Sequence, residues 1–331
     1  MKVAVLGAGA WGSALAISLA SQHAITLWAR DAEQIDTLAR ERQNARYLPG
    51  FTFPDSIHYS ADLAHAIQRA EFILAVVPTS GFRALLSALT QAGNTAPVVW
   101  ACKGFEPGGG QLLHQVAAAS LPTNVACGVL SGPSFAQEVA QGLPCALTLA
   151  AHDAGFAHDA AACLHNHHLR VYSSTDVVGV ELGGAVKNVM AIAAGISDGM
   201  GFGYNARAAL ITRGLAEITR LGLALGGKLE TFMGLAGVGD LMLTCTGDLS
   251  RNRRVGVQLA QGQSLEAILK QLGHTAEGVH TCAEVLHMAA ALKVDMPITR
   301  AVHSVMFEGL APRLAMESLL SREPKAEYRA S

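Results

Sequence analysis

Apolar residues in the first half of the chain form short, nearly unbroken runs. Runs rich in Val, Ile and Leu that end at glycine, proline or polar residues are typical of strands buried on both faces of a parallel sheet. Between them the spacing is helical, first at residues 10–21 and then in a helix that Asp31 can cap and that runs through Arg40. The predicted strands are residues 2–6, 25–28, 72–77, 98–101 and 125–130. Strands that alternate with helices predict a parallel sheet with helical crossovers.

After about Ser174 the β-rich runs stop, and Ala, Leu, Gly and charged residues at helical spacing continue to the C-terminus. Glycine clusters at residues 198–204, 234–239 and 247–250 predict loops between these helices. The predicted fold is an α/β domain over residues 1–174, with a mostly parallel, doubly wound sheet, followed by an all-helical domain over residues 175–331. A chain of 331 residues is long enough for two such hydrophobic cores.

The N-terminal segment, residues 3–20, is also apolar enough to resemble a signal peptide behind Lys2. Its three glycines would weaken a membrane-inserting helix, whereas a buried strand, a glycine turn and a small-residue helix explain every position. No other stretch has the length and apolarity expected of a membrane-spanning helix. We therefore expect no membrane insertion.

Charge and cysteine content narrow the class of partner. The 24 basic and 26 acidic residues nearly balance, so the chain lacks the positive field that collects nucleic acid or an anionic membrane. The six cysteines are scattered without a CxxC pair, which is typical of a reducing compartment. We expect a cytoplasmic protein with a small-molecule substrate and no nucleic-acid partner.

The sequence Gly7-Ala8-Gly9-Ala10-Trp11-Gly12 follows the first predicted strand directly and opens the first helix. In that position the pattern GxGxxG is typical of a Rossmann domain that binds a dinucleotide. Gly7 permits the tight turn, Gly9 lets the backbone approach the pyrophosphate, and Gly12 allows close packing of the helix on the strands. The helix N-terminus supplies free N–H groups to the anion. These residues predict that NAD or NADP binds here.

The end of the second predicted strand reads Ala29-Arg30-Asp31. An acidic residue there would bind the ribose 2′-hydroxyl of NAD, and an arginine would accept the 2′-phosphate of NADP. Arg30 indicates that NADP is accepted, while Asp31 can equally be a helix cap. A solvated surface arginine explains Arg30 equally well.

Polar residues follow two further predicted strands at the same edge of the sheet. Lys103 stands in Ala101-Cys102-Lys103-Gly104, and the next strand ends in Ser131-Gly132-Pro133-Ser134-Phe135. Ligands of open α/β sheets bind beyond the carboxyl ends of the strands. We therefore expect both loops to lie where a substrate meets the nicotinamide.

A single lysine, Lys187, interrupts the apolar helix predicted over residues 181–194. Gly183 lies one turn before it, which predicts open space beside the lysine. Burial of an unpaired ammonium lowers its pKa, so such a lysine can act as a general acid or base. The alternative is a lysine whose stem crosses the apolar helix and whose ammonium reaches solvent.

Two polar clusters of the helical half offer partners for such a lysine and for an anion. Asp240 follows a glycine cluster and can hold a lysine by a hydrogen bond. The run Ser250-Arg251-Asn252-Arg253-Arg254 offers groups suited to phosphate, although a solvated helix start would look the same. The histidines at 165, 167 and 168 lack a carboxylate or cysteine at ligand spacing, so no metal site is predicted.

Taken in this order, the motifs resemble the bacterial NAD(P)-dependent glycerol-3-phosphate dehydrogenases, and the resemblance covers nearly the whole chain. It implies reversible, NAD(P)H-dependent reduction of glycerone phosphate (dihydroxyacetone phosphate) to sn-glycerol 3-phosphate, which supplies glycerophospholipid synthesis. Besides the motifs above, it rests on Asn44-Ala45-Arg46-Tyr47-Leu48-Pro49, Gly183-Gly184-Ala185-Val186-Lys187-Asn188, the segment from Asn205-Ala206-Arg207 to Glu217, and Gly239-Asp240.

The resemblance also implies roles for individual residues. Lys187 is the implied catalytic proton donor and acceptor, with Asp240 orienting it and Lys103 stabilising the charge that develops on the substrate oxygen. The implied substrate-binding residues are Lys103, Gly132, Ser134, Lys187, Asp240, Ser250, Arg251 and Asn252. The implied cofactor-binding residues, besides Gly7, Gly9 and Gly12, are Ala10, Trp11, Arg30, Tyr47, Lys103, Ala136, Arg251 and Glu277.

Two other interpretations fit part of the pattern. A dehydrogenase of the 3-hydroxyacid or 6-phosphogluconate type also joins a Rossmann domain to a helical one, but Lys103 and residues 250–252 argue against it. A non-catalytic redox sensor that binds NAD(P) would not need both Lys187 and Asp240. The sequence determines neither the preferred cofactor nor the oligomeric state, for which a homodimer is one option.

Overall fold

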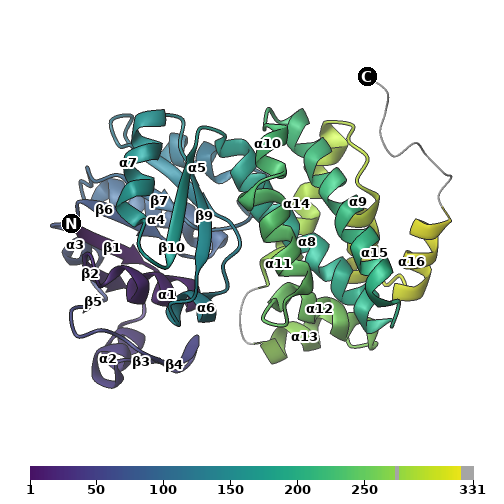
Figure 1. Ribbon diagram of the computed structural model, residues 1–331, viewed down its shortest axis with the longest axis horizontal. Coiled ribbons are helices and arrows are strands. Elements are labelled where there is room, and N and C mark those ends of the chain that lie inside the picture. The colour runs from purple at the N-terminus through teal and green to yellow at the C-terminus, as the bar shows by residue number, and fades with distance from the viewer. Residues whose placement is uncertain (273–275, 322–331) are drawn as a thin grey trace.

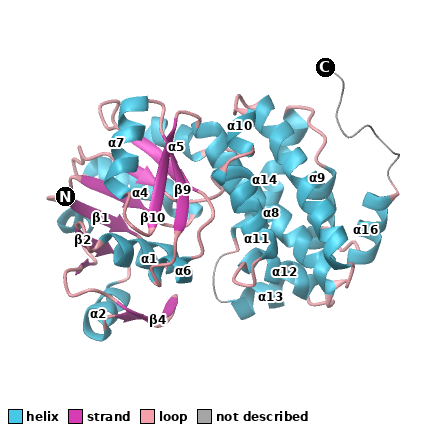
Figure 2. Cartoon of the chain, in the orientation of Figure 1, coloured by secondary structure: helices cyan, strands magenta, loops and turns pink. Residues whose placement is uncertain are grey.

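The computed structural model describes residues 1–272 and 276–321. A sheet flanked by helices forms one half of the molecule and helices alone form the other, and the two halves lie side by side (Figure 1). Coloured by secondary structure, the strands are confined to the N-terminal half (Figure 2). This arrangement confirms the predicted fold class, an α/β region followed by an all-helical one.

The large sheet has eight strands in the order β10-β9-β8-β7-β6-β1-β2-β5, and β3 and β4 form a separate two-stranded sheet. Neighbouring strands of the large sheet are parallel, except that β8 and β9 are antiparallel. The strands are β1 (Lys2–Leu6), β2 (Ala24–Trp28), β3 (Gln43–Asn44), β4 (Leu48–Thr52), β5 (His58–Ser60), β6 (Phe72–Ala75), β7 (Val98–Trp100), β8 (Cys127–Ser131), β9 (Cys145–Ala150) and β10 (Leu169–Ser174).

The strand order reverses direction between β1 and β6, because β2 and β5 extend to one side and β6 to β10 to the other. At such a point the loops after the two central strands diverge and leave a crevice at the carboxyl edge, where open α/β sheets bind ligands. The helices of this half are α1 (Ala10–Leu19), α2 (Ala32–Glu41), α3 (Leu63–Ile67), α4 (Thr79–Gln91), α5 (Leu113–Ser120), α6 (Ala136–Ala140) and α7 (Ala154–Leu164).

Strands β5, β9 and β10 and the β3–β4 pair were not predicted from the sequence. Strand β9 reads Cys-Ala-Leu-Thr-Leu-Ala, and the alanine-rich surroundings favour helix locally. Strand β10 lies at the edge of the sheet, with only Leu169 and Val171 of its six residues buried, so it lacks the continuous apolar run of the predicted strands. Pairing with neighbouring strands therefore outweighs local propensity here.

Helix α8 lies at the centre of the helical half, and helices such as α9, α11, α12 and α14 pack around it (Figure 1). The glycine cluster at 247–250 forms an inter-helix loop as predicted, but only residues 200–202 of the cluster at 198–204 lie between helices, and the cluster at 234–239 forms mainly a π-helix, η1. The elements of this half are α8 (Val177–Gly199), α9 (Gly203–Ala224), α10 (Leu229–Phe232), η1 (Leu235–Gly239), α11 (Asp240–Thr246), α12 (Arg251–Ala260), α13 (Leu265–Leu272), α14 (Glu277–Ala291), α15 (Pro297–Phe307) and α16 (Pro312–Leu320).

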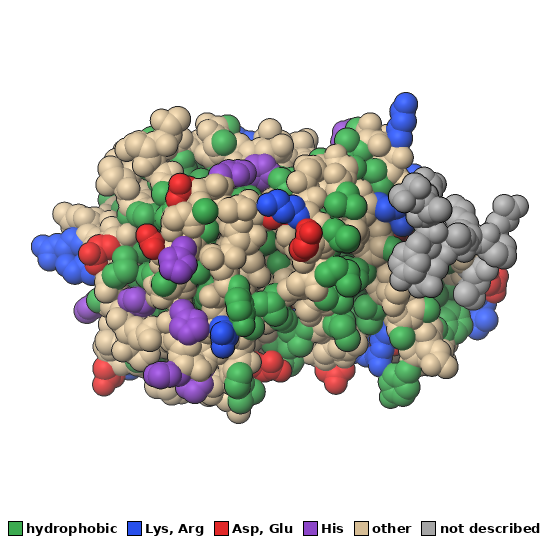
Figure 3. Space-filling view, turned by 45° about the horizontal axis from the view of Figure 1, so that its top comes forward, with side chains coloured by type: hydrophobic (Ala, Val, Ile, Leu, Met, Phe, Trp, Pro, Cys, Tyr) green, Lys and Arg blue, Asp and Glu red, His purple; other side chains and the backbone are tan. Residues whose placement is uncertain are grey.

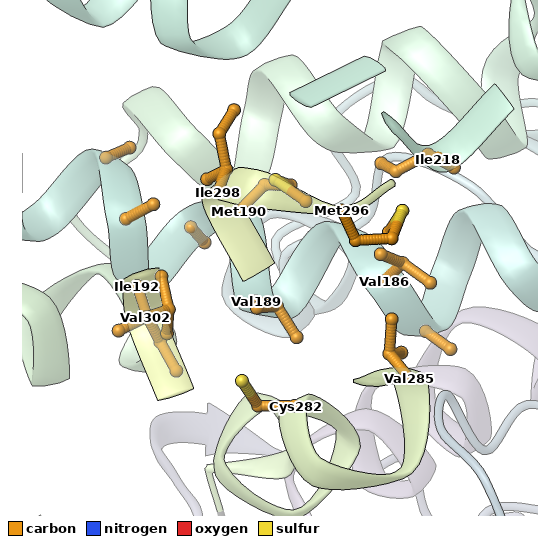
Figure 4. Packing of buried hydrophobic residues seen from close by; sticks show 14 of the residues in the cluster. Val186, Val189, Met190, Ile192, Ile218, Cys282, Val285, Met296, Ile298 and Val302 are labelled. Carbon is orange, nitrogen blue, oxygen red and sulfur yellow. The ribbon is translucent and has the colours of Figure 1, made fainter. Parts of the chain in front are cut away.

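Helix α8 is long and apolar enough to cross a membrane by length and composition, so the expectation that only the N-terminal segment approached this length was wrong. However, 94% of its apolar window is buried inside the structure. Figure 4 shows Val186, Val189 and Met190 of α8 among apolar side chains from neighbouring helices. The apolarity of α8 is therefore explained by its place in the helical core.

On the face seen in Figure 3, acidic and basic side chains are interspersed. Among the described residues drawn there, neither charge sign gathers into an extended patch. This surface agrees with the near balance of charge in the whole sequence.

Candidate active site

The three glycines of the turn between β1 and α1 have different surroundings. Gly7 has a φ of +127°, and a Cβ there would lie 2.5 Å from the Val76 carbonyl oxygen. A Cβ on Gly12 would lie 1.9 Å from the Gly7 carbonyl oxygen, whereas a Cβ on Gly9 would meet nothing within 4 Å. Gly7 and Gly12 are therefore needed to form the turn, and Gly9 leaves free space at the N-terminus of α1.

Two amide side chains from elsewhere in the sequence brace this turn. The Ala8 carbonyl oxygen accepts hydrogen bonds from Gln34 Nε2 at 2.8 Å and from Asn44 Nδ2 at 3.0 Å. Asn44 is 3% exposed and also donates to Ser13 Oγ at 2.8 Å. These bonds fix the backbone of the turn before any anion binds, which lowers the ordering cost of binding. Sequence reasoning assigned neither amide a role.

Other predicted cofactor residues lie near the start of α1. Trp11 and Ala136 contribute to one apolar cluster, so α6 packs beside the glycine turn. The Trp11 Nε1 atom is buried and has no hydrogen-bond partner among the described residues. Tyr47 carries the Arg46 guanidinium over its ring, 5.0 Å from the centroid. Ala10, the first residue of α1, is partly exposed.

The end of β2 separates Arg30 from Asp31. The Asp31 side chain accepts a hydrogen bond from Gln34 N at 3.2 Å and caps α2, which is the structural role that the sequence left open. Arg30 is exposed next to this cap. Because the Asp31 carboxylate is held by the helix, Arg30 is the charged group of this pair that remains available to a ligand.

Lys187 lies in the middle of α8 and is 6% exposed. Its ammonium donates to Asp240 Oδ1 and to Thr244 Oγ1, the latter at 3.0 Å, and both partners lie on α11. Burial lowers the pKa of Lys187 to about 7, although the Asp240 carboxylate opposes the shift and the Lys103 charge adds to it. Lys187 is thus a buried, hydrogen-bonded amine, and the alternative of an ammonium that extends to solvent is excluded.

The Asp240 carboxylate joins the two halves of the molecule. It is 1% exposed, and its Oδ2 accepts a hydrogen bond from Lys103 Nζ at 2.8 Å while Oδ1 accepts from Lys187. Lys103 also donates to the Gly132 carbonyl oxygen at 3.0 Å, and Ser134 Oγ donates to the same oxygen at 3.0 Å. One carboxylate therefore holds a lysine from the sheet half and a lysine from the helical half.

The glycines before Lys187 serve helix packing. A Cβ on Gly183 would lie 2.2 Å from the Ala236 carbonyl oxygen of η1, and a Cβ on Gly184 would lie 2.5 Å from Ser131 Oγ at the end of β8. The space beside Lys187 that Gly183 was expected to leave open is thus filled by backbone. This expectation was wrong because sequence spacing does not reveal which element packs against a helix.

The N-terminus of α12 holds three of the predicted substrate residues in different ways. Ser250 caps the helix, since its Oγ accepts from Arg253 N at 3.2 Å. Asn252 is 8% exposed; its Nδ2 donates to Asn188 Oδ1 at 3.0 Å, and its Oδ1 accepts from Gly278 N at 3.1 Å. Arg251 is exposed and forms no ion pair with a described residue. Arg251 is therefore the cation of this turn that is available to a ligand.

Glu277 begins α14 and faces the sheet half. Its Oε2 accepts a hydrogen bond from Thr79 Oγ1 at 3.0 Å, at the start of α4. Burial raises the pKa of Glu277, while Thr79 and the Arg251 charge oppose the shift. Glu277 and Arg251 therefore lie close enough to interact electrostatically, although α12 and α14 are separate helices.

The structure thus brings most predicted site residues into two groups. Lys103, Gly132, Ser134, Lys187 and Asp240 are joined by hydrogen bonds, and Trp11 and Ala136 share an apolar cluster beside the glycine turn. No group of histidine, cysteine and acidic residues that could hold a metal ion occurs within residues 1–272 and 276–321. Sequence reasoning missed Thr244 and the hydrogen bond of Asn188 to Asn252, for which the sequence holds no local signal.

Two family profiles together span nearly the whole chain. The profile described as "NAD-dependent glycerol-3-phosphate dehydrogenase N-terminus" matches residues 2–157, and its C-terminal counterpart matches residues 176–317. A protein named glycerol-3-phosphate dehydrogenase [NAD(P)+] from Nitrosospira multiformis is 59% identical over 331 residues, 99% of each chain. The chain belongs to this family.

Other members of this glycerol-3-phosphate dehydrogenase family agree with that assignment. The protein of the same name from Thiobacillus denitrificans is 58% identical over 99% of this chain and 100% of its own. The crystal structure of glycerol-3-phosphate dehydrogenase from Coxiella burnetii superposes with a TM-score of 0.93 at 42% identity, over 97% of this chain and 99% of that one. The match over both halves confirms the resemblance drawn from the motifs.

Proposed function

We propose that the chain catalyses the reversible reduction of glycerone phosphate to sn-glycerol 3-phosphate with NAD(P)H. The observation that carries this proposal is the buried Lys187, held by Asp240 together with Lys103 at the carboxyl edge of a dinucleotide-binding sheet. It is supported by membership in a family whose members are named for this activity.

The glycine turn fits a dinucleotide. Gly9 leaves free space at the N-terminus of α1, and Trp11 Nε1 is buried without a partner among the described residues. We propose that the backbone around Gly9, Ala10 and Trp11 holds the pyrophosphate. Further cofactor contacts are proposed for Arg30, Tyr47, Lys103, Ala136, Arg251 and Glu277. When bound, NAD(P)H supplies the hydride that reduces the substrate carbonyl carbon.

Lys187 would supply the proton to the carbonyl oxygen as negative charge develops there. A pKa of about 7 lets this amine both donate a proton and take it back near neutral pH. Lys103, whose side chain is 17% exposed, would stabilise the same oxygen by its positive charge. Asp240 would hold both amines in place, because its two carboxylate oxygens each accept from one lysine.

The phosphate of the substrate would bind at the N-terminus of α12. Arg251 supplies an available guanidinium, and the first turn of a helix offers free N–H groups to an anion. We propose that Ser250 and Asn252 shape this turn, while Gly132 and Ser134 line the opposite side beside Lys103. Binding energy from the phosphate would then position the carbonyl against Lys187.

We extend the proposal to domain roles and context. Residues 1–174 would form the cofactor domain and residues 175–331 the substrate domain. The enzyme would act in the cytoplasm, without membrane insertion or a nucleic-acid partner. A homodimer is one option for its assembly. Its product would supply glycerophospholipid synthesis. A 3-hydroxyacid or 6-phosphogluconate-type dehydrogenase and an NAD(P)-binding redox sensor are the functions that the experiment must exclude.

The test is to measure oxidation of NADH and NADPH side by side with glycerone phosphate, using the purified full chain. We expect turnover with glycerone phosphate and, in reverse, oxidation of sn-glycerol 3-phosphate, with no oxidation of 3-hydroxyisobutyrate or 6-phosphogluconate. Turnover of either of those acids in place of the three-carbon phosphate would contradict the proposal. Cofactor binding without turnover of any of them would favour the redox sensor.

A further inference from the structure

The Arg253 guanidinium, unlike that of Arg251, forms ion pairs within the part of the chain that the structure describes. Its Nε and Nη2 atoms each lie 2.8 Å from Asp198 Oδ2, and its Nη1 lies 2.8 Å from Asp248 Oδ1. Arg207 Nη1 donates to the same Asp198 oxygen at 3.0 Å. Two guanidinium groups thus share one carboxylate oxygen. The basic run from 250 to 254 is therefore divided between a residue available to a ligand and a residue that holds α12 in place.

The carboxylates that hold Arg253 differ in environment. The Asp198 side chain is 15% exposed, as is that of Arg253, whereas the Asp248 side chain is 96% exposed. Ion pairs between exposed groups add little to stability because water screens them, while charge-assisted hydrogen bonds between partly desolvated groups are stronger. Asp198 is therefore the partner that determines where Arg253 lies.

Asp198 and Lys187 lie on the same helix, about three turns apart on the same face. The backbones of α8 and α12 touch between them: a Cβ on Gly195 would lie 2.0 Å from the Arg253 carbonyl oxygen, and a Cβ on Gly256 would lie 2.0 Å from the Ile192 carbonyl oxygen. This contact stops α12 from moving closer to α8. The hydrogen bond from Arg253 to Asp198 stops the first turn of α12 from moving away from α8.

We propose that Asp198 is a positioning residue for the substrate phosphate. Acting through Arg253, it fixes the first turn of α12, and hence Arg251, at a set distance from Lys187 on α8. Because the phosphate and the carbonyl belong to one small substrate, that distance determines whether both can be bound at once. This inference rests on the proposed function, since it assumes that Arg251 binds the phosphate.

The test compares Asp198→Asn with Asp248→Asn. Each change removes the negative charge of one carboxylate partner of Arg253 without changing side-chain size. For Asp198→Asn we expect the KM for glycerone phosphate to rise about tenfold, with kcat within about twofold of the wild type. The KM for NADPH should rise less, because Arg251 is only one of several proposed cofactor contacts. Asp248→Asn should change every constant by less than about twofold, because that ion pair is exposed.

Arg253→Gln provides a second test of the proposed positioning role. It should raise the KM for glycerone phosphate as Asp198→Asn does, and the double variant should add little, because both changes break the contact between Arg253 and Asp198. A loss of folded enzyme would lower kcat per chain and the thermal midpoint but would leave KM unchanged. Unchanged KM in Asp198→Asn, with the wild type active, would overturn the inference.

Calorimetric binding of inorganic phosphate separates this inference from the proposed function. The affinity for phosphate should fall about tenfold in Asp198→Asn and stay near the wild-type value in Asp248→Asn. If the three proteins bind phosphate with these relative affinities but the wild type does not turn over glycerone phosphate, the proposed function fails and the positioning role stands. Equal phosphate affinity in all three proteins would contradict the positioning role whatever the substrate.

Discussion

The proposed cofactor region and the proposed substrate region of this dehydrogenase are made from different parts of the chain. Around Gly7–Gly12 the contacts offered to a ligand come from backbone groups, and consecutive residues form the turn. Around Lys187 they come from side chains of the loop after β7, of α8 and of α11, which lie far apart in sequence. The first region depends on backbone shape and the second on the partners of buried charges.

This difference predicts different responses to substitution. In the glycine turn, a side chain is harmful where it meets backbone, so the effect depends on the space around each Cβ. In the lysine cluster, removal of one charged group leaves another buried without its partner, so effects on catalysis and on pKa are coupled. The predictions below test these two behaviours.

The largest effect is expected at the lysine cluster. Lys187→Ala removes the proposed proton donor, so kcat for reduction of glycerone phosphate should fall by about a thousandfold. Because Lys187 is not part of the glycine turn, the dissociation constant of NADPH should change by less than about twofold, measured by fluorescence titration. Normal turnover in this variant would refute the assignment of Lys187.

Arg251→Ala tests the phosphate contact. We expect the KM for glycerone phosphate to rise about thirtyfold, because a charge-assisted bond to phosphate is lost, with a much smaller change in kcat. Arg254→Ala, which removes another exposed arginine of α12, is the matched control and should have little effect. Equal effects of the two changes would mean that Arg251 acts only through the general charge of this surface.

The glycines of the turn test the backbone region. Gly12→Ala places a Cβ 1.9 Å from the Gly7 carbonyl oxygen, so we expect loss of cofactor affinity together with a loss of stability. That loss should be about 1 to 3 kcal/mol by thermal or urea unfolding. Gly9→Ala meets no protein atom within 4 Å and should leave stability unchanged. It should raise the KM for NADPH about tenfold, because the methyl group enters the space proposed for the pyrophosphate.

The pH dependence tests the state of Lys187. Reduction needs the protonated amine, and its pKa is lowered to about 7, so kcat for reduction should fall as pH rises above that value. The fall should be about tenfold per pH unit, and kcat for the reverse reaction should instead rise to a plateau. In Asp240→Asn the carboxylate that opposes the shift is absent, so the fall should begin at lower pH. A pH profile that does not respond to Asp240→Asn would count against the coupling.

The smallest effect is expected at the edge of the cofactor region. Arg30→Ala should raise the KM for NADPH about fivefold and leave the KM for NADH unchanged, since only NADP carries a 2′-phosphate. The comparison of both cofactors in one variant is its own control. Equal changes for NADH and NADPH would identify Arg30 as a general surface charge.

Much of the sheet half was predictable because its signals are local. The run at residues 2–6, the glycines that follow it and the Asp31 cap each specify backbone geometry within a few residues. The strands at 145–150 and 169–174 could not be predicted, because sheet pairing rather than local propensity makes them strands. The reversal of strand order beside β1 is also decided by pairing.

The sequence by itself determined that a dinucleotide turn follows the first strand, that the second half is helical, and that Lys187 interrupts an apolar helix. Only the tertiary structure decided how the charged side chains pair. It placed Asp240, 137 residues from Lys103 and 53 from Lys187, between the two lysines, and it committed Arg253 but not Arg251 to a carboxylate. The physical reason is that backbone turns depend on neighbours in sequence, whereas the partners of buried charges depend on which helices pack together.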